Sequence, residues 1–360
     1  MIRQKNIKHI RTGCFLCLLF FQLTSTYSQT TQSKNPVFLS ITPYYGKFQV
    51  HTRSLRPFKN TNPYGVEFEM SRLILTEKIR ETFGTFVKWG TCFNYVNFNH
   101  KDLGYALTGL AHIEPFFKLN SEWRISVKLG TGLAYMSNPY HPTDNPQNLT
   151  YSSRIAFPLY VGANTYYFFN KQTAVKINLS YQHISNGGFK QPNLGINYPV
   201  IGLGLEHALD TYSIPPKKAL GQYEKERCVG LLMGYSIKED TTNTNNQHVA
   251  TAMLFYSRQV TRINSITGAI STEYQQIAQS SNALDEWSIA PMIGNELIFG
   301  KLLFGQQIGA YILRGESAPN ALLQNYYLLY KINSNLRTGV NLKVHGRVAD
   351  YLSFQFGLVF

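Results

Sequence analysis

Apolar and polar side chains alternate along segment after segment of this chain, and this alternation limits its fold more than any other feature. In one such segment Trp123, Ile125, Val127 and Leu129 interleave with polar or small residues. Side chains on a β-strand point alternately to the two faces of a sheet, so the pattern predicts strands with one apolar face. The sequence shows no convincing helical periodicity, and we therefore expect an all-β chain.

The length of these segments favours a membrane barrel. Many are about ten residues long or longer, as transmembrane β-strands are. Strands of a secreted β-sandwich, the alternative all-β fold, are usually shorter, at about 5–6 residues. The last segment supports the barrel, because Leu352, Phe354, Phe356 and Leu358 share one phase with the terminal Phe360. Such an ending resembles the assembly signal of bacterial outer-membrane barrels, which implies the barrel assembly machinery as a partner.

We expect an antiparallel transmembrane β-barrel of about 12–16 strands, with 16 as the best count. An even count places both chain ends in the periplasm and the odd-to-even connections outside the cell. Residues 209–224 fit this parity poorly, because they are long and rich in proline yet would be periplasmic. We expect them to separate an eight-stranded half, residues 37–208, from additional strands in residues 225–360. The strands are expected near residues 37–52, 64–75, 85–98, 103–118, 123–137, 152–169, 172–185, 196–208, 225–238, 247–258, 264–278, 286–298, 301–313, 325–333, 337–346 and 350–360.

Residues 1–28 have the pattern of a secretory signal peptide. They begin with the cations Arg3, Lys5, Lys8 and Arg11 and continue with a short apolar core. That core is too short to span a membrane as a helix, and no later stretch approaches 18 consecutive apolar residues. The mature chain, residues 29–360, is therefore expected to cross the outer membrane of a Gram-negative bacterium with its strands.

The mature chain is basic. Removing the four signal cations from 34 Lys and Arg leaves 30, against 20 Asp and Glu, a net charge of +10. Secretion argues against nucleic acid as the partner, and attraction to an anionic lipid surface fits better. Only Cys92 and Cys228 remain after the signal segment, too few for a disulfide framework.

A general base and a hydroxyl nucleophile stand side by side at the end of one alternating segment. His183 and Ser185 share the phase of the apolar Leu179. If that face contacts lipid, the pair lies where a membrane lipid can reach it. Asn197 has the phase that places it beside His183 across the next hairpin, whereas Glu206 has the opposite phase and is expected to face the lumen.

These positions suggest serine esterase chemistry. His183 would take the proton from Ser185, which attacks an ester carbonyl and forms an acyl-enzyme. Asn197 would hold the imidazole in the useful tautomer, as an amide does in Cys-His-Asn proteases.

The connection after the predicted nucleophile supplies the remaining candidates. The main-chain N–H groups of Gly187 and Gly188, or the side chain of Asn186, would stabilise the oxyanion. Lys190 and Asn193 are the candidate substrate-binding residues, since an ammonium at headgroup depth can meet a lipid phosphate.

The stretch from His183 to Asn197 resembles the signature of the outer-membrane lipid A 3-O-deacylases, the PagL family. His183 and Ser185 match the family's base and nucleophile, and the run Lys190-Gln191-Pro192-Asn193 matches closely. That family is an eight-stranded barrel with a Ser-His-Glu triad that removes the acyl chain at the 3 position of lipid A. The resemblance implies this fold for residues 37–208, and this reaction. The departure is Asn197, where the family has Glu.

The same residues are also similar to outer-membrane phospholipase A, a twelve-stranded barrel with a Ser-His-Asn triad, calcium dependence and activity on dimerisation. Asn197 and the larger barrel favour that family, and the Lys-Gln-Pro-Asn run favours the deacylases. A catalytically silent porin-like barrel is the alternative from another class. We expect a serine ester hydrolase acting on lipid A in the outer leaflet, with phospholipid as the alternative substrate. No metal or cofactor is expected, except calcium if the enzyme is phospholipase-like.

The remaining histidines, including His112, His207 and His345, show no metal-ligand spacing. We interpret them as ordinary strand or loop residues. The oligomeric state stays open.

Overall fold

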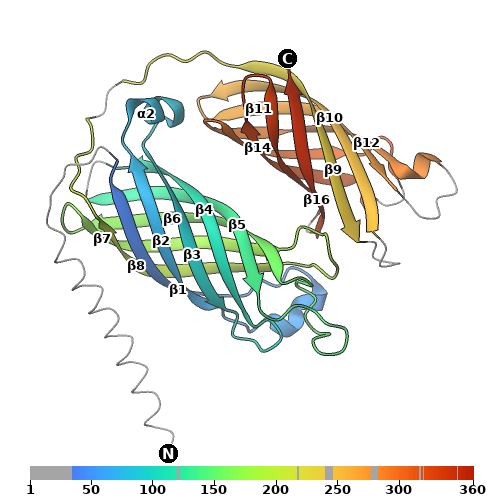
Figure 1. Cartoon of the computed structure of the whole chain (residues 1–360), viewed down its shortest axis with the longest axis horizontal. Helices are drawn as coiled ribbons and strands as arrows, with labels where there is room; N and C mark the ends of the chain where they lie inside the picture. The colour runs from blue at the N-terminus through green and yellow to red at the C-terminus, as the bar shows by residue number, and fades with distance from the viewer. Residues whose placement is uncertain are drawn as a thin grey trace, which may run out of the picture.

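The computed structural model describes residues 35–119, 122–216, 219–239, 246–276, 283–315, 318, 320–346 and 348–360. The predicted signal peptide, residues 1–28, lies outside these ranges. Within them, sixteen antiparallel strands close as two barrels of eight strands each (Figure 1). The predicted antiparallel barrel fold and the count of sixteen strands are confirmed, and the strands divide between two closed barrels instead of forming one.

The first barrel is closed by the pairing of its first and last strands. Leu205 of β8 lies opposite Ile41 of β1, and every other strand pairs with its neighbours in the chain. The strands are β1 (Val37–Gly46), β2 (Tyr64–Ile74), β3 (Val87–Asn97), β4 (Tyr105–Lys118), β5 (Trp123–Met136), β6 (Ile155–Phe168), β7 (Thr173–Ser185) and β8 (Ile196–Ala208).

The second barrel closes in the same way, with Leu358 of β16 opposite Leu231 of β9. The proline-rich segment 209–224 is the connection between the two barrels. The strands are β9 (Arg227–Glu239), β10 (Asn246–Thr261), β11 (Asn264–Gln275), β12 (Trp287–Phe299), β13 (Leu302–Ala310), β14 (Leu322–Lys331), β15 (Leu336–His345) and β16 (Val348–Val359).

The alternation of the sequence sorts side chains between lipid and lumen. Leu179 of β7 and Leu203 of β8 are 56% and 62% exposed on the outer face. Lys176 and Asn178, in the other phase of β7, are buried inside the barrel. Both barrels therefore present an apolar belt, as transmembrane barrels do.

Side chains fill the lumen of the first barrel. The ammonium group of Lys128 lies 2.8 Å from Glu67 and 2.9 Å from Glu69, and Lys176 contacts the same two carboxylates. Lys88 pairs with Glu206 at 2.6 Å. An eight-stranded barrel is just wide enough for its own side chains, so this lumen is a packed core and not a channel. The predicted luminal position of Glu206 agrees with this pairing.

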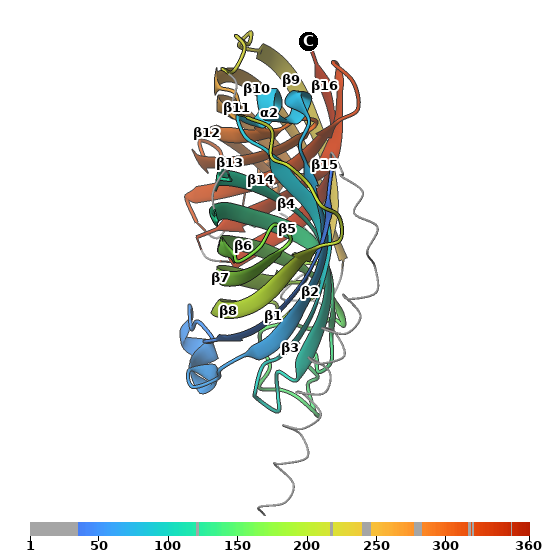
Figure 2. The same ribbon diagram turned by 90° about the vertical axis from the view of Figure 1, so that its left-hand side faces the viewer.

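Short helical segments lie in the connections between strands. They are η1 (Arg53–Phe58), α2 (Glu77–Phe83) and η2 (Ala283–Glu286). None of the helices in the described ranges is long and apolar enough to cross a membrane. Figure 2 shows α2 at one end of the molecule and η1, in blue, at the opposite end. By strand parity, the end with α2 is periplasmic and the end with η1 faces outside.

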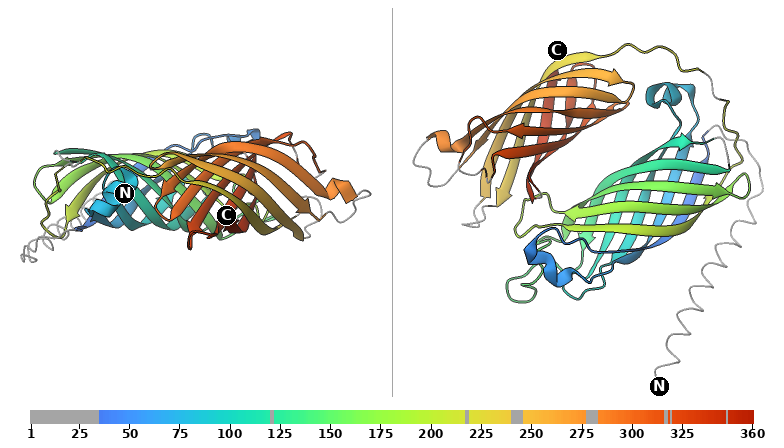
Figure 3. Two further views of the ribbon diagram at one scale, coloured as in Figure 1. Left: turned by 90° about the horizontal axis from the view of Figure 1, so that it is seen from above. Right: turned by 180° about the vertical axis from the view of Figure 1, so that it is seen from behind.

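The two barrels lie side by side (Figure 3), and side chains of one contact the other. At the periplasmic end Phe83 stacks on Phe299, with ring centroids 6.2 Å apart, within an apolar cluster that includes Val87 and Ile113. Arg262 Nη1 donates to the Glu81 carbonyl at 2.7 Å. The segment α2 follows β2 and Phe299 ends β12, and the connections after even-numbered strands are periplasmic. The contact therefore joins the periplasmic ends of the two barrels. Both barrels cross the membrane in the same direction.

Candidate functional site

His183 and Asn197 form a hydrogen-bonded pair on the outer face of the first barrel. The antiparallel register of β7 and β8 places the two residues opposite each other, and His183 Nδ1 lies 2.6 Å from Asn197 Oδ1. An amide oxygen only accepts hydrogen bonds, so the imidazole donates from Nδ1. Its Nε2 is then unprotonated in the neutral ring, which is the tautomer a general base needs.

A second histidine fixes the orientation of the Asn197 amide. Asn197 Nδ2 lies 3.1 Å from His51 Nδ1, and His51 Nε2 lies 2.9 Å from the Leu194 carbonyl oxygen. The carbonyl requires a proton on Nε2, so His51 Nδ1 accepts from the amide. This relay turns the Asn197 oxygen towards His183. His51 was missed by sequence reasoning, because it is far from His183 in the chain. The strand expected at residues 37–52 ends at Gly46, and His51 lies in the connection that follows.

Gly195 makes room for the His183 ring. Its φ of +75° favours glycine. A Cβ atom at this position would also lie 2.7 Å from His183 Cε1. Only a residue without a side chain allows the ring to lie where it meets Asn197, which adds Gly195 to the residues that shape the site.

Ser185 ends β7 on the same face but is covered. It is only 5% exposed, whereas Leu179 of the same strand and phase is 56% exposed. In the described part of the chain no hydrogen bond joins its hydroxyl to His183. Catalytic hydrogen bonds are often formed only when substrate is present, and residues i and i+2 of a strand share a face. The two side chains are therefore neighbours without a direct bond.

The loop after Ser185 uses most of its predicted oxyanion donors for its own bonds. Asn186 donates from its main chain to Asn193 Oδ1 at 3.0 Å and from its side chain to the Lys190 carbonyl at 2.7 Å. Gly188 N–H donates to Asn186 Oδ1 at 3.0 Å. Within the described residues, the N–H group of Gly187 contacts no acceptor, so it is the one predicted donor left for substrate.

The two predicted substrate-binding residues differ in exposure. Asn193 is 5% exposed and closes the loop through its bond to Asn186, so the structure gives it a supporting position. The side chain of Lys190 is exposed and stays available to a phosphate.

The second barrel forms one wall of this site. The N–H group of Gln191 donates to Glu239 Oε2 of β9 at 2.8 Å. A Cβ at Gly188 would lie 2.3 Å from the Asp350 carbonyl oxygen, and one at Gly187 would lie 3.1 Å from Leu352 Cβ. The loop therefore packs directly against β16, which explains the burial of Ser185.

The outer loops of the first barrel support the other side of the site. Gly195 N–H donates to the Thr150 carbonyl at 2.8 Å. The neighbouring Tyr151 donates its hydroxyl to the Leu103 carbonyl at 2.6 Å, and burial raises the pKa of this tyrosine. Tyr151 belongs to an apolar cluster with Phe48, Phe58 and Tyr198 that closes the outer mouth of the barrel.

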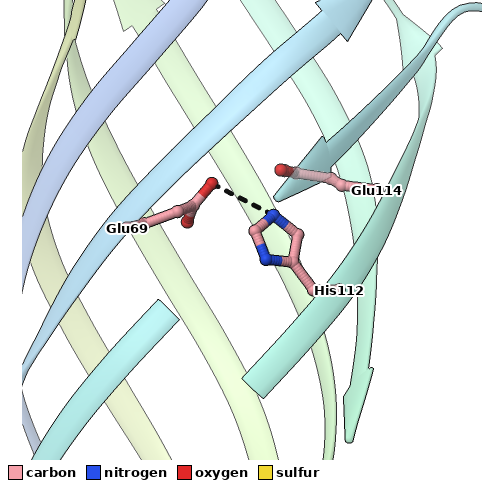
Figure 4. A group of neighbouring side chains, drawn as sticks. All are labelled: Glu69, His112 and Glu114. Atoms are coloured by element: carbon pink, nitrogen blue, oxygen red, sulfur yellow. Dashed lines mark ion pairs between the residues drawn. The ribbon is translucent and has the colours of Figure 1, made fainter. Parts of the chain in front are cut away.

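A second group of chemically active side chains lies inside the first barrel (Figure 4). Glu69, His112 and Glu114 bring one ligand atom each within 4.8 Å of one another. His112 Nε2 lies 3.4 Å from Glu69 Oε1. Sequence reasoning assigned His112 no role, because the three residues come together only when β2 and β4 curve around the lumen.

Buried lysines offset most of the negative charge around this luminal group. Four buried carboxylates, those of Glu67, Glu69, Glu114 and Glu206, face three buried lysines. The ammonium groups of Lys128 and Lys176 lie 2.9 Å from Glu69 Oε2, whereas Oε1 of the same carboxylate faces His112. These two positive charges would repel a cation bound beside them. The group lies in the lumen, and the His183 pair lies on the outer face.

Two protein-family models match the chain, one over each barrel. The model of the lipid A 3-O-deacylase (PagL) family matches residues 62–206, and the model of the acyloxyacyl hydrolase C-terminal domain (PagL_C) matches residues 228–360. Together the two models match most of the chain. No curated protein sequence matches it.

Three solved barrels illustrate the range of structures to which the chain is similar. The crystal structure of the outer membrane enzyme PagL is 17% identical, covers 46% of this chain and 97% of its own, and has a TM-score of 0.35. Pseudomonas aeruginosa OccK1 is 11% identical and covers 91% of this chain and 98% of its own, with a TM-score of 0.26. A Rh. blastica porin mutant is 7% identical and covers 91% and 100%, with a TM-score of 0.19. TM-scores this low carry no argument about the fold, which is defined by the strand pairing.

Proposed function

Because the lipid A 3-O-deacylase (PagL) family model matches residues 62–206 and the PagL_C model matches residues 228–360, we propose that the chain removes the ester-linked acyl chain at the 3 position of lipid A in the outer membrane. The observation that carries this proposal is the His183–Asn197 hydrogen bond on the lipid-facing side of the region that matches the family model. It gives the His183 imidazole a defined tautomer, two residues before Ser185 at the end of β7, which supports its proposed role as the base.

The proposed reaction has two steps. His183 Nε2 takes the proton of Ser185, and the serine oxygen attacks the ester carbonyl carbon of lipid A. The N–H group of Gly187 stabilises the oxyanion. The intermediate collapses, the sugar hydroxyl leaves with the proton from His183, and the acyl group stays on Ser185. A water molecule, deprotonated by His183, then releases the fatty acid and restores the serine.

Asn197 replaces the family's Glu in this scheme. Its amide oxygen orients the imidazole, and His51 holds that amide in place. A neutral amide stabilises the imidazolium less than a carboxylate does, so the reaction of this chain relies more on orientation than on a buried negative charge.

The proposed acyl site lies where the chain of a lipid arrives. Phe157 and Phe189 meet edge to face beside Ser185, with ring centroids 6.3 Å apart, and Phe189 is 41% exposed. An acyl chain can reach this apolar edge from the outer leaflet without entering the packed lumen.

A direct comparison of substrates tests the function. Purified full-length protein in detergent is offered lipid A and phosphatidylethanolamine separately, each with and without a calcium chelator. We expect release of the 3-linked acyl chain from lipid A, unaffected by the chelator. Faster, chelator-sensitive release of fatty acid from phosphatidylethanolamine would instead support the phospholipase alternative, which the Ser-His-Asn combination favours. No release from either lipid would support a catalytically silent barrel.

Lys190 is expected to act in binding and not in turnover. The Lys190→Glu variant should raise the KM for lipid A and leave kcat largely intact, because the exposed ammonium is proposed to meet a lipid phosphate in both ground and transition states. The effect should shrink with added salt, since exposed charges are screened beyond about 10 Å at ~0.1 M. Lys101→Glu, in another exposed outer loop, is the control. An unchanged KM at low salt would remove Lys190 from the binding site.

Glu239 is expected to act as a positioning residue from the second barrel. Its carboxylate accepts the Gln191 N–H, and a hydrogen bond to a charged group contributes about 1.5–3 kcal/mol. Glu239→Ala should therefore lower kcat roughly tenfold to hundredfold with little change in KM, because the loop carrying Gly187 loses an anchor. Glu239→Gln keeps an oxygen acceptor and should restore most of the rate. Equal kcat values for the wild type and the alanine variant would contradict this role.

A further inference from the structure

Two arginines face each other at the periplasmic rim of the second barrel. Arg227 of β9 lies directly opposite Arg258 of β10. Both are exposed and share the lipid-facing phase of Val229 and Tyr256, which are also exposed. Residues opposite each other in an antiparallel pair have Cβ atoms about 4.5–5.5 Å apart, and like charges in such positions repel.

No carboxylate offsets this repulsion within the described residues. Neither arginine takes part in an ion pair there, and the adjacent Glu226 is already paired with Lys331 at 3.0 Å. The exposed Lys225 adds a third positive charge, and Glu224 makes no ion pair. The arrangement therefore calls for an anion from outside the chain.

An apolar hollow begins beside this arginine pair. Gly268 of β11 lies between Tyr256 of β10 and Ile293 of β12, and a Cβ at Gly268 would meet no atom within 4 Å. The hollow has a volume of about 480 Å³, and its lining includes Tyr256, Ile266 and Ile293 together with Lys225 and Arg258. Gly268 has no side chain to fill this position in an otherwise continuous apolar face. The resulting gap opens towards lipid.

The strand order places this hollow in the periplasmic leaflet. Strand β10 ends at Thr261 and β11 begins at Asn264, and this even-to-odd connection is periplasmic. Arg258 lies three residues from the end of its strand, at the depth of lipid headgroups. Gly268 lies two residues further from the rim than Ile266, which is opposite Arg258, and so reaches into the hydrocarbon.

We propose that this hollow binds one anionic glycerophospholipid of the periplasmic leaflet, with its phosphate between Arg227 and Arg258 and one acyl chain beside Gly268. The phosphate supplies the charge that the arginine pair lacks, and the acyl chain fills the gap between Tyr256 and Ile293. This lipid is not a substrate, because Ser185 lies at the opposite end of the other barrel.

Native mass spectrometry of the full-length protein tests the site. The protein is exchanged into detergent that contains phosphatidylglycerol or phosphatidylcholine at equal concentration, and the retained lipid is counted. Wild type should retain one phosphatidylglycerol in preference to phosphatidylcholine. Arg227→Gln combined with Arg258→Gln should weaken this retention roughly thirtyfold, at about 1 kcal/mol for each cation near a lipid phosphate. Gly268→Leu, which fills the gap but keeps both arginines, should also lose the lipid.

A matched control removes two other rim cations. Lys118→Gln combined with Lys171→Gln changes the net charge equally at the periplasmic end of the first barrel, where both lysines are exposed. It should retain phosphatidylglycerol as the wild type does. Equal loss in this control, equal retention of both lipids by the wild type, or full retention by Gly268→Leu would each overturn the proposed site. Lipid A cleavage is measured in the same samples and should be unchanged, so this test does not depend on the proposed reaction.

Discussion

The Ser185→Ala variant is expected to lose lipid A cleavage by roughly 10³–10⁶-fold while both barrels stay folded. The substitution removes the proposed nucleophile and leaves the oxyanion donor and the binding surface in place, so only a small residual hydrolysis should remain. Release of the 3-linked acyl chain at saturating lipid A measures the loss. The difference in electrophoretic migration between heated and unheated samples reports whether the barrels are closed.

A serine far from the site serves as the control for a general effect of replacing serine by alanine. Ser334 is exposed in a periplasmic turn of the second barrel, and Ser334→Ala should cleave lipid A like the wild type. Near-normal turnover by folded Ser185→Ala would rule out this nucleophile.

The His183→Ala variant should lose a similar factor, roughly 10³–10⁶, because the base and the nucleophile act as one unit. For the same reason the double variant with Ser185→Ala should be no slower than either single variant. Turnover of the three variants at saturating lipid A gives the comparison. His141→Ala, in an exposed outer loop, is the control and should keep its activity. Losses that multiply in the double variant would mean that the two residues act independently.

The strands could be predicted from the sequence because each is encoded by its own alternation. Strand β8 was expected at residues 196–208 and is found at Ile196–Ala208. The pairing of His183 with Asn197 follows from the same local information, since phase along two adjacent strands determines which side chains meet. Because β7 and β8 follow each other in the chain, they were expected to pair, and few other partners were available for this part of the site.

The division into two barrels depends on information that no local pattern carries. Closure is decided by the pairing of β8 with β1 and of β16 with β9, between residues far apart in the chain. The long proline-rich segment 209–224 was the one hint, because it broke the expected parity. His51 and Glu239 were missed for the same reason, since each meets the site through a single hydrogen bond from a distant segment.

The wall that covers Ser185 comes from the last strand of the chain. Asp350 and Leu352 belong to β16, so they are synthesised after every other part of the site. A partly exported chain already contains His183 and Asn197, but the loop after Ser185 gains its support only when the final strand is in place. We therefore expect the geometry of the site to depend on completion of the second barrel, although the proposed base and nucleophile both lie in the first.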